Sequence, residues 1–128
     1  MINSTAVDYV NVLTKADDAI YQREAILANN ISNVDTPGYK RKDLNFEGVL
    51  SLELGRCKHQ SLDKKISELD TSKLNANVYT DHSNYSYRMD GNNVDIDTEN
   101  VELASEQIKY EALTSSISSQ FSRMRSVL

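Results

Sequence analysis

Apolar residues in the first quarter of the chain recur at the spacing of an amphipathic helix. The main stripe repeats every seven residues and consists of Ala6, Leu13, Ile20, Leu27 and Val34. The opposite face is polar, with Lys15, Asp18 and Gln22. A repeat of about seven residues is typical of coiled-coil contacts. The pattern predicts an N-terminal helix over residues 5–34, in which we expect Leu13, Ile20, Leu27 and Val34 to pack.

A second helical pattern occupies the end of the chain. Acidic residues lie at its start and Arg125 lies at its end, an arrangement that complements the helix dipole. We therefore predict a helix over residues 98–125, capped by Asp97 or Thr98. Its apolar stripe rotates slowly around the axis, as in a supercoiled contact. The positions that we expect to pack are Val101, Ile108, Leu113, Ile117 and Phe121.

The middle of the chain, residues 40–93, has no sustained period. Residues 46–54 fit either a short helix or a strand, and residues 64–74 fit one or two helical turns. Residues 78–80 and 85–87 fit short edge strands within a polar stretch that indicates loop, or disorder until a partner binds.

The fold class that follows is mainly α, with a single domain over residues 1–128. We expect the long terminal helices to pair as a coiled-coil-like hairpin around an irregular or partly disordered middle. Such a hairpin leaves apolar flanks in water, and exposed apolar patches usually mark interfaces.

The segment that follows the N-terminal pattern, residues 28–41, ends the helix with an unusual set of residues. Three asparagines continue the helical spacing, and Thr36-Pro37-Gly38 then closes it. Pro37 disfavours helix at Thr36, and Gly38 permits a backbone angle that other residues avoid. Two interpretations remain open: an elaborate helix C-cap with solvated amides, or a packed array in which the amides bond the backbone.

Residues 28–33 and 36–41 together resemble the signature of the bacterial flagellar axial proteins of the rod and hook. Within the flagellar basal-body rod protein family, the short proximal-rod type is the most similar. Residues 43–47 and 92–97, with Glu99, also resemble family segments. The resemblance implies an assembly motif made of Asn29, Asn30, Ile31, Asn33, Thr36, Pro37, Gly38 and Tyr39.

The resemblance also implies a function and a location. The chain would be a structural subunit of the proximal rod, part of the drive shaft that transmits torque from motor to hook. Its partners would be other rod proteins and basal-body ring or export-gate components, in a helical multi-subunit structure. It would lie in the cell envelope after export by the flagellar type III apparatus, without a cleaved signal peptide. The alternative is a soluble helical adaptor or secretion chaperone.

Composition and charge limit other functions. The net charge of −5 and the pI of about 5.0 argue against nucleic acid as a partner. The short basic run of residues 40–42 is expected to be a solvated loop. No N-terminal apolar run resembles a signal peptide, and none is long enough to span a membrane.

The sequence has few candidate residues for catalysis or metal binding, so we expect the chain not to be an enzyme and to have no cofactor and no small-molecule substrate. Cys57, His59, Asp81 and His82 are the only candidate ligands for a transition metal, and they lack the paired spacing of a zinc site. Cys57 with His59 is a possible nucleophile and base, but no third group supports them. Residues 90–97 resemble a calcium loop only superficially, because the glycine is misplaced. A turn followed by a helix cap is expected there.

Overall fold

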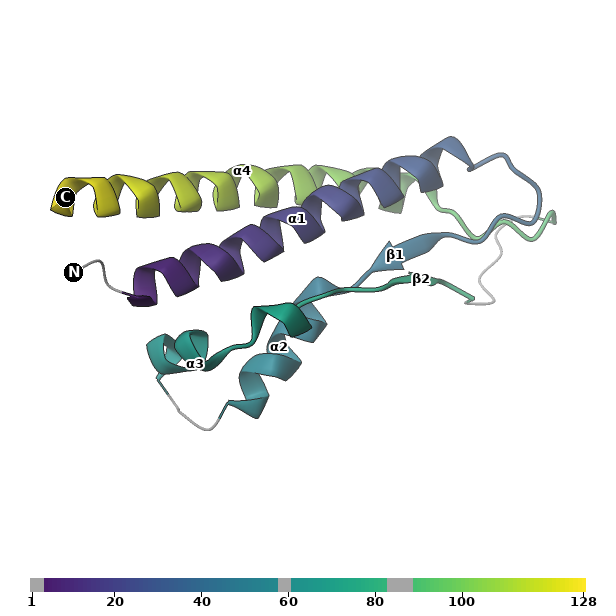
Figure 1. Ribbon diagram of the computed structural model, residues 1–128. Helices are drawn as coiled ribbons and strands as arrows, with labels where there is room; N and C mark the ends of the chain where they lie inside the picture. Colours follow the sequence, from purple (N-terminus) through teal and green to yellow (C-terminus); the bar gives the residue numbers. More distant parts are fainter. Residues whose placement is uncertain (1–3, 58–60, 83–88) are drawn as a thin grey trace.

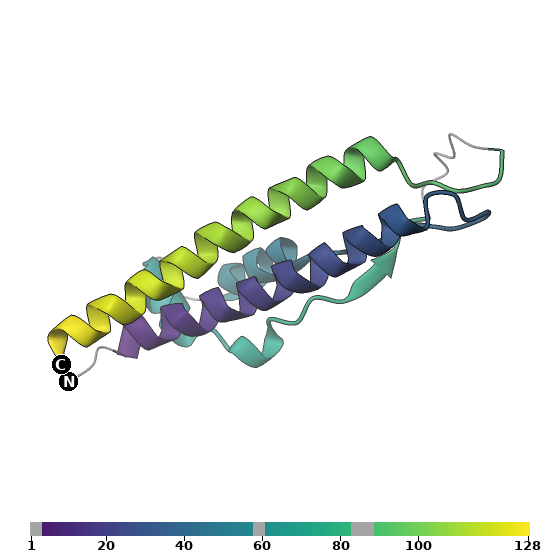
Figure 2. The same cartoon turned by 90° about the horizontal axis from the view of Figure 1, so that it is seen from above.

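The computed structural model describes residues 4–57, 61–82 and 89–128, and two long helices dominate it (Figure 1). Helix α1 spans Ser4–Ser32 and helix α4 spans Ile96–Val127. They run antiparallel side by side, so the start of α1 and the end of α4 lie at the same end of the molecule (Figure 2). The predicted mainly α fold with paired terminal helices is therefore confirmed.

The helix ends differ from the predicted ranges. Helix α1 ends at Ser32, so the range 5–34 extended too far. Val34 lies in a turn, where its N–H donates to the Ile31 carbonyl at 3.2 Å. Helix α4 begins earlier than predicted because Asp95 is its N-cap and accepts the N–H groups of Asp97 and Thr98. The predicted caps Asp97 and Thr98 were wrong, since both already lie inside the helix.

The middle segment contains short elements below the helical pair. They are β1 (Lys42–Leu44), α2 (Phe46–Arg56), α3 (Leu62–Glu68), the 3-10 helix η1 (Thr71–Lys73) and β2 (Val78–Thr80). The open choice for residues 46–54 is thus settled as helix, and the predicted strand at 78–80 is confirmed. Strands β1 and β2 pair antiparallel, with Asp43 opposite Tyr79. The strand predicted at 85–87 lies outside the described residues.

The hydrophobic core lies between α1 and this middle segment. Its buried side chains come from α1 and from residues 44–74 of the middle, and are Val12, Ala19, Leu44, Phe46, Ile66, Leu69 and Leu74. Helix α1 therefore contacts two partners, because the middle packs on one side of it and α4 on another. Two contacts require a wider apolar face than a stripe with one apolar residue in every seven can provide. Val12 and Ala19, which lie outside the predicted stripe, supply that extra width.

The side chains that we expected to pack fall into two groups. Leu27 is fully buried, and Leu13, Ile20, Val34, Leu113 and Ile117 are half-buried. In contrast, Val101 and Ile108 are each 69% exposed and Phe121 is 51% exposed. The first two come from a face of α4 that points away from α1. These three side chains are thus not packed within the single chain, and their packing against another chain stays a prediction.

Candidate functional site

Polar side chains from α1, β1, α4 and the loops next to them meet where α1 ends and α4 begins. We call this cluster the polar junction; it consists of Arg23, Asn30, Arg41, Asp43, Asp81, Asn92, Asn93, Glu99, Glu102 and Glu106. Asn30, Asp43, Asn92, Asn93, Glu99 and Glu106 are buried. Buried polar groups are tolerated where they are hydrogen-bonded and where charges are paired, so each partner has to be identified.

Asp43 on β1 lies between two arginines. Its carboxylate accepts from Arg23 Nε at 2.8 Å and from Arg41 Nη2 at 3.1 Å, and it also accepts the Leu44 N–H at 2.7 Å. Burial alone would raise the pKa of this carboxyl, but these hydrogen bonds outweigh burial and hold the pKa below its ordinary value. The bond to Asp43 is also the main reason that the pKa of Arg23 is raised. Asp43 is therefore the anion that joins the two guanidinium groups.

The same two arginines bind the start of α4. Arg23 donates to Glu102 at 3.0 Å and also to Glu106, while Arg41 donates to Glu99. Burial of Arg41 would lower its pKa, but its bonds to Glu99 and Asp43 reverse that effect and raise it. Removing one partner of a buried ion pair leaves an uncompensated charge, which is costly. The contact between the first turns of α4 and the rest of the chain is therefore ionic rather than apolar.

Asn30 of the predicted motif is fully buried and uses both ends of its amide. Its Nδ2 donates to the Lys42 carbonyl at 2.7 Å and to Glu99 at 3.1 Å. Its Oδ1 accepts the Lys42 N–H and the Tyr39 hydroxyl, both at 3.0 Å. An amide offers two donors and two acceptor sites, so Asn30 is fully satisfied. This residue fits the packed-array interpretation of the asparagine-rich segment.

Residues that precede α4 stabilise the turn after α1 through hydrogen bonds. Asn92 Nδ2 lies 2.9 Å from the carbonyl oxygens of Asn33, Val34 and Thr36. The Gly38 N–H donates to the Asp90 carbonyl at 2.8 Å, and Gly38 has a φ of 71°. Carbonyls near a helix end need partners outside the helix. Here the side chain of Asn92 supplies them, so the C-cap of α1 depends on a residue far away in sequence.

The other motif residues lie at the surface of this end of the molecule. Asn29, Thr36, Pro37 and Gly38 are exposed, whereas Ile31, Asn33 and Tyr39 are half-buried. Asn33 donates to the Asn29 carbonyl at 2.8 Å, and Thr36 donates to Asn33 at 3.1 Å. These bonds fit the helix-cap interpretation. The packed-array interpretation therefore holds at Asn30, and the helix-cap interpretation holds at Asn29 and Asn33. The assembly role of the motif stays a prediction.

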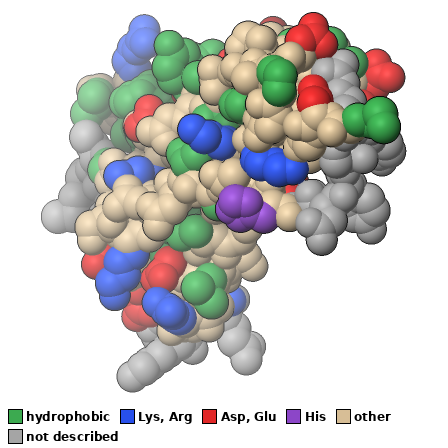
Figure 3. All heavy atoms as spheres, turned by 90° about the vertical axis from the view of Figure 1, so that its right-hand side faces the viewer, with side chains coloured by type: hydrophobic (Ala, Val, Ile, Leu, Met, Phe, Trp, Pro, Cys, Tyr) green, Lys and Arg blue, Asp and Glu red, His purple; other side chains and the backbone are tan. Residues whose placement is uncertain are grey.

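The basic run of residues 40–42 is not the solvated loop that we expected. Arg41 is bound in the polar junction, and Lys40 Nζ donates to the Gly91 carbonyl; only Lys42 is exposed. Figure 3 views this end and shows basic side chains gathered near the centre of the face. Lys40 and Arg41 thus bind a carbonyl and carboxylates of the same chain, which explains two of the three basic residues in this run.

The candidate ligands for a metal have other partners or lie apart. Asp81 pairs with Arg41 at 3.3 Å, and the Cys57 thiol lies 3.5 Å from the Glu53 carbonyl. His82 is exposed, and His59 lies outside the described residues. Over residues 4–57, 61–82 and 89–128, no three His, Cys, Asp or Glu side chains form a metal-binding group. Within the same ranges, no helix combines the length and the apolar character needed to cross a membrane.

The segment compared with a calcium loop forms a turn and a helix cap. Asp90 accepts the Asn92 N–H at 3.0 Å, and Gly91 has a φ of 80°. Asp95 then caps α4. The expected turn and cap are confirmed, although the capping residue differs from the ones predicted.

Sequence reasoning missed most of the polar junction. Arg23 was not singled out, although it lies on the face of α1 that also carries Ala19 and Asn30. Glu99, Glu102 and Glu106 are spaced three and four residues apart, which places them on one helical face. That spacing was the available signal, because an acidic stripe on a helix needs cations opposite it when it is buried. The identity of those cations could not be read from spacing within α4.

Comparisons with known proteins agree on one family. A family model described as "Flagella basal body rod protein" matches residues 19–40. A flagellar basal body rod protein FlgB of Bacillus subtilis is 32% identical over 128 residues, which cover 100% of this chain and 95% of that protein. The FlgB of Escherichia coli is 32% identical over 84% of this chain and 83% of its own length. The FlgB of Borreliella burgdorferi is 32% identical over 87% of this chain and 88% of its own.

Proposed function

The chain belongs to the FlgB family of flagellar basal body rod proteins, and we propose that this structural rod subunit stands in the proximal part of the rod. There it forms part of the basal-body drive shaft that carries torque from the motor to the hook. Its partners are other rod proteins and ring or export-gate components of the basal body. It reaches the cell envelope through the flagellar type III apparatus without a cleaved signal peptide.

The observation that carries an assembly role is the apolar face of α4 that no part of the described chain covers. Val101 and Ile108 are each 69% exposed, and the exposed Ala104 extends the same face. These positions are three to four residues apart, so they form one continuous stripe on the helix. A stripe of this kind on a monomer is typical of a protein–protein interface. We name Val101, Ala104 and Ile108 the outer stripe.

The side chains of the site act by packing and not by catalysis. The polar junction fixes how α4 lies on α1, and thereby fixes the direction in which the outer stripe points. The exposed motif residues Asn29, Thr36, Pro37 and Gly38 form a second surface for neighbouring subunits at the end of the molecule. No cofactor, nucleic acid or small-molecule substrate takes part in this function.

A deletion strain tests the rod function. Cells that lack the chain are expected to be non-motile and to lack complete hook-basal bodies, and the wild-type gene on a plasmid restores both. The chain is also expected in purified basal bodies from the restored strain. Normal basal bodies in the deletion strain would contradict a rod subunit and would favour a cytosolic adaptor or secretion chaperone.

A further inference from the structure

A groove of about 570 Å³ opens between α1, α2 and α4. A volume of this size accommodates a few side chains rather than a whole domain. Apolar residues from all three helices line it: Ala16, Ala19, Phe46, Leu50 and Leu113. The alanines leave space where larger side chains would fill it, so the groove suits an apolar projection from another molecule.

The charged residues that line the groove have an excess of carboxylates. Four carboxylates, from Asp43, Glu47, Glu102 and Glu106, line it together with two cations, Arg23 and Lys109. Arg41, which does not line the groove, also pairs with Asp43. Asp43 and Glu106 are buried in the polar junction, whereas the side chains of Glu47 and Glu102 are 79% and 40% exposed. Lys109 is 41% exposed on the same rim and pairs with Glu47 at 2.9 Å. Two carboxylates and one cation leave the accessible rim with a net negative charge, so a complementary occupant is basic as well as apolar.

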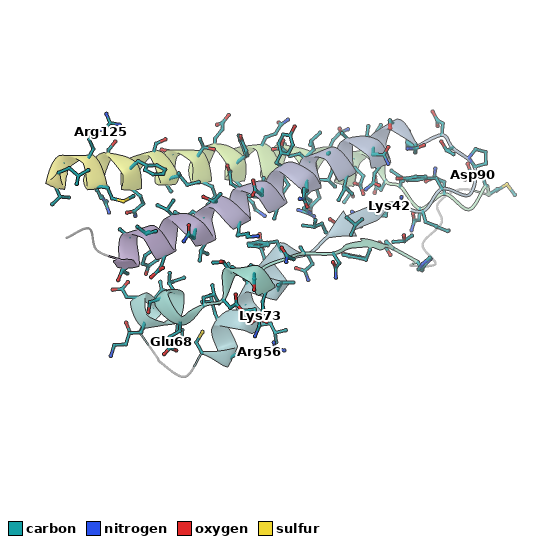
Figure 4. All side chains as sticks on the ribbon, viewed as in Figure 1. Lys42, Arg56, Glu68, Lys73, Asp90 and Arg125 are labelled. Carbon is teal, nitrogen blue, oxygen red and sulfur yellow. The ribbon has the colours of Figure 1, made fainter. Side chains whose placement is uncertain are left out.

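The end of α4 and its C-cap, Leu128, have that combination of properties. Phe121 is 51% exposed and Leu128 is 88% exposed, and the exposed Arg125 stands between them. Spacings of four and three residues place the three side chains on one helical face. Figure 4 shows Arg125 pointing away from α1, and its guanidinium forms no ion pair with residues 4–57, 61–82 or 89–128. We name Phe121, Arg125 and Leu128 the tail face.

We propose that the tail face of a second copy of this chain occupies the groove. In this contact Phe121 and Leu128 lie on the apolar floor, and Arg125 lies against the exposed carboxylates of Glu47 and Glu102. The tail face of the same copy cannot do so, because α4 is one continuous helix whose residues 102–113 already form a wall of the groove. The inference rests on the proposed rod function and names one contact that such a subunit makes.

The two partner surfaces are at different places on the chain, which determines the kind of assembly. A copy that receives a tail face in its groove still presents its own tail face. The contact is therefore heterologous, and repeating it produces an open chain of subunits unless the rotation happens to close a ring. The smallest such ring is a two-fold dimer in which the tail face of each copy lies in the groove of the other.

Sedimentation velocity of the purified full chain over a concentration series tests the contact. Arg125→Glu inactivates the tail face, and Glu47→Arg inactivates the groove. Ala112→Trp places a large side chain at a position that lines the groove, and it is the second groove variant in case Glu47→Arg fails to fold. Lys73→Glu, at an exposed cation on η1 that does not line the groove, is the control. Melting followed by circular dichroism establishes that each variant is folded.

The wild type and Lys73→Glu are expected to grow beyond dimers as the concentration rises. Each inactivated variant is expected to weaken association by at least about tenfold. An equimolar mixture of Arg125→Glu with a groove variant is expected to form a dimer and to stop there, because only one tail face and one groove remain active.

Three outcomes would overturn the contact. They are a wild type that stays monomeric, variants that associate like the wild type, and a mixture of variants that stays monomeric. If the groove binds a small molecule or a different rod protein instead, the wild type stays monomeric, which is the first of these outcomes. Failure of the rod function itself is recognised separately, by normal basal bodies in the deletion strain.

Discussion

Asn30 Nδ2 of α1 donates a hydrogen bond to the Glu99 carboxylate of α4 across 3.1 Å. Both side chains are buried, with exposures of 0% and 1%. The bond joins the asparagine-rich segment to the first turn of the C-terminal helix, which lies 69 residues further along the chain. The buried part of the motif thus holds the two terminal helices in register within one subunit.

Replacing Asn30 with aspartate tests this joint. Asn30→Asp removes the donor and places a second negative charge beside Glu99 in a buried site. We expect the free energy of unfolding to fall by about 3–5 kcal/mol, as for a broken buried ion pair. Urea unfolding followed by circular dichroism measures it. Asn29→Asp, at the exposed neighbour, is the control and is expected to change the value by about 0.5 kcal/mol. Equal losses in the two variants would refute the role of Asn30.

Acid is expected to loosen the polar junction through Asp43. Because the folded state lowers the pKa of this carboxyl, the unfolded chain takes up the proton first as the pH falls. The stability that Asp43 contributes is therefore complete above the ordinary aspartate pKa of about 4 and is lost as the pH falls through the lower folded value. Melting temperatures measured from neutral to acidic pH follow this loss.

Asp43→Asn separates this contribution from general acid effects. We expect the variant to lose about 3 kcal/mol near pH 7, because two arginines lose a shared anion. Its stability is then expected to fall less than that of the wild type on acidification. Asp18→Asn, at an exposed carboxylate on α1, should keep the wild-type pH profile. A wild-type profile in Asp43→Asn would show that another group controls the acid response.

The turn after α1 depends on the backbone of Gly38. Its φ of 71° is unfavourable for residues with a Cβ, although the nearest atom to such a Cβ is 4.0 Å away. Gly38→Ala is therefore expected to cost about 1–2 kcal/mol through backbone strain alone. Gly55→Ala is the matched control, because Gly55 lies in α2 with open space around it. There we expect a gain of up to about 1 kcal/mol. Equal effects in thermal unfolding would contradict the strain argument.

A charge introduced by mutation between the two long helices is expected to destabilise the fold as well as to abolish motility. Ile20 and Leu113 are half-buried and line the same groove. Ile20→Asp or Leu113→Asp removes apolar burial and adds a carboxylate to an already acidic site, so we expect a loss of about 2–4 kcal/mol together with loss of motility. Full motility in either variant would contradict this packing assignment.

The sequence predicted what depends on neighbours along the chain. The two long helices and the turn at Thr36-Pro37-Gly38 follow from local spacing and from backbone constraints on proline and glycine. Which face of α4 is buried and which is exposed does not follow from the hydrophobic pattern of α4 itself. Glu99 and Glu106 are buried because Arg41 and Arg23 lie opposite them, on segments 58 and 83 residues away. Apolar Val101 and Ile108 consequently face outward, against the usual expectation from hydrophobicity.

The central claim is that other subunits cover the outer stripe, and Ile108→Asp tests it most directly. Ile108 is 69% exposed, so the variant is expected to keep the unfolding free energy of the wild type within about 0.5 kcal/mol. The same variant, expressed in the deletion strain, is expected to leave cells non-motile and to be missing from purified basal bodies. Gln107→Asp, at the adjacent exposed position, should restore motility and controls for the added charge. Motile cells whose basal bodies contain Ile108→Asp at wild-type levels would contradict the claim.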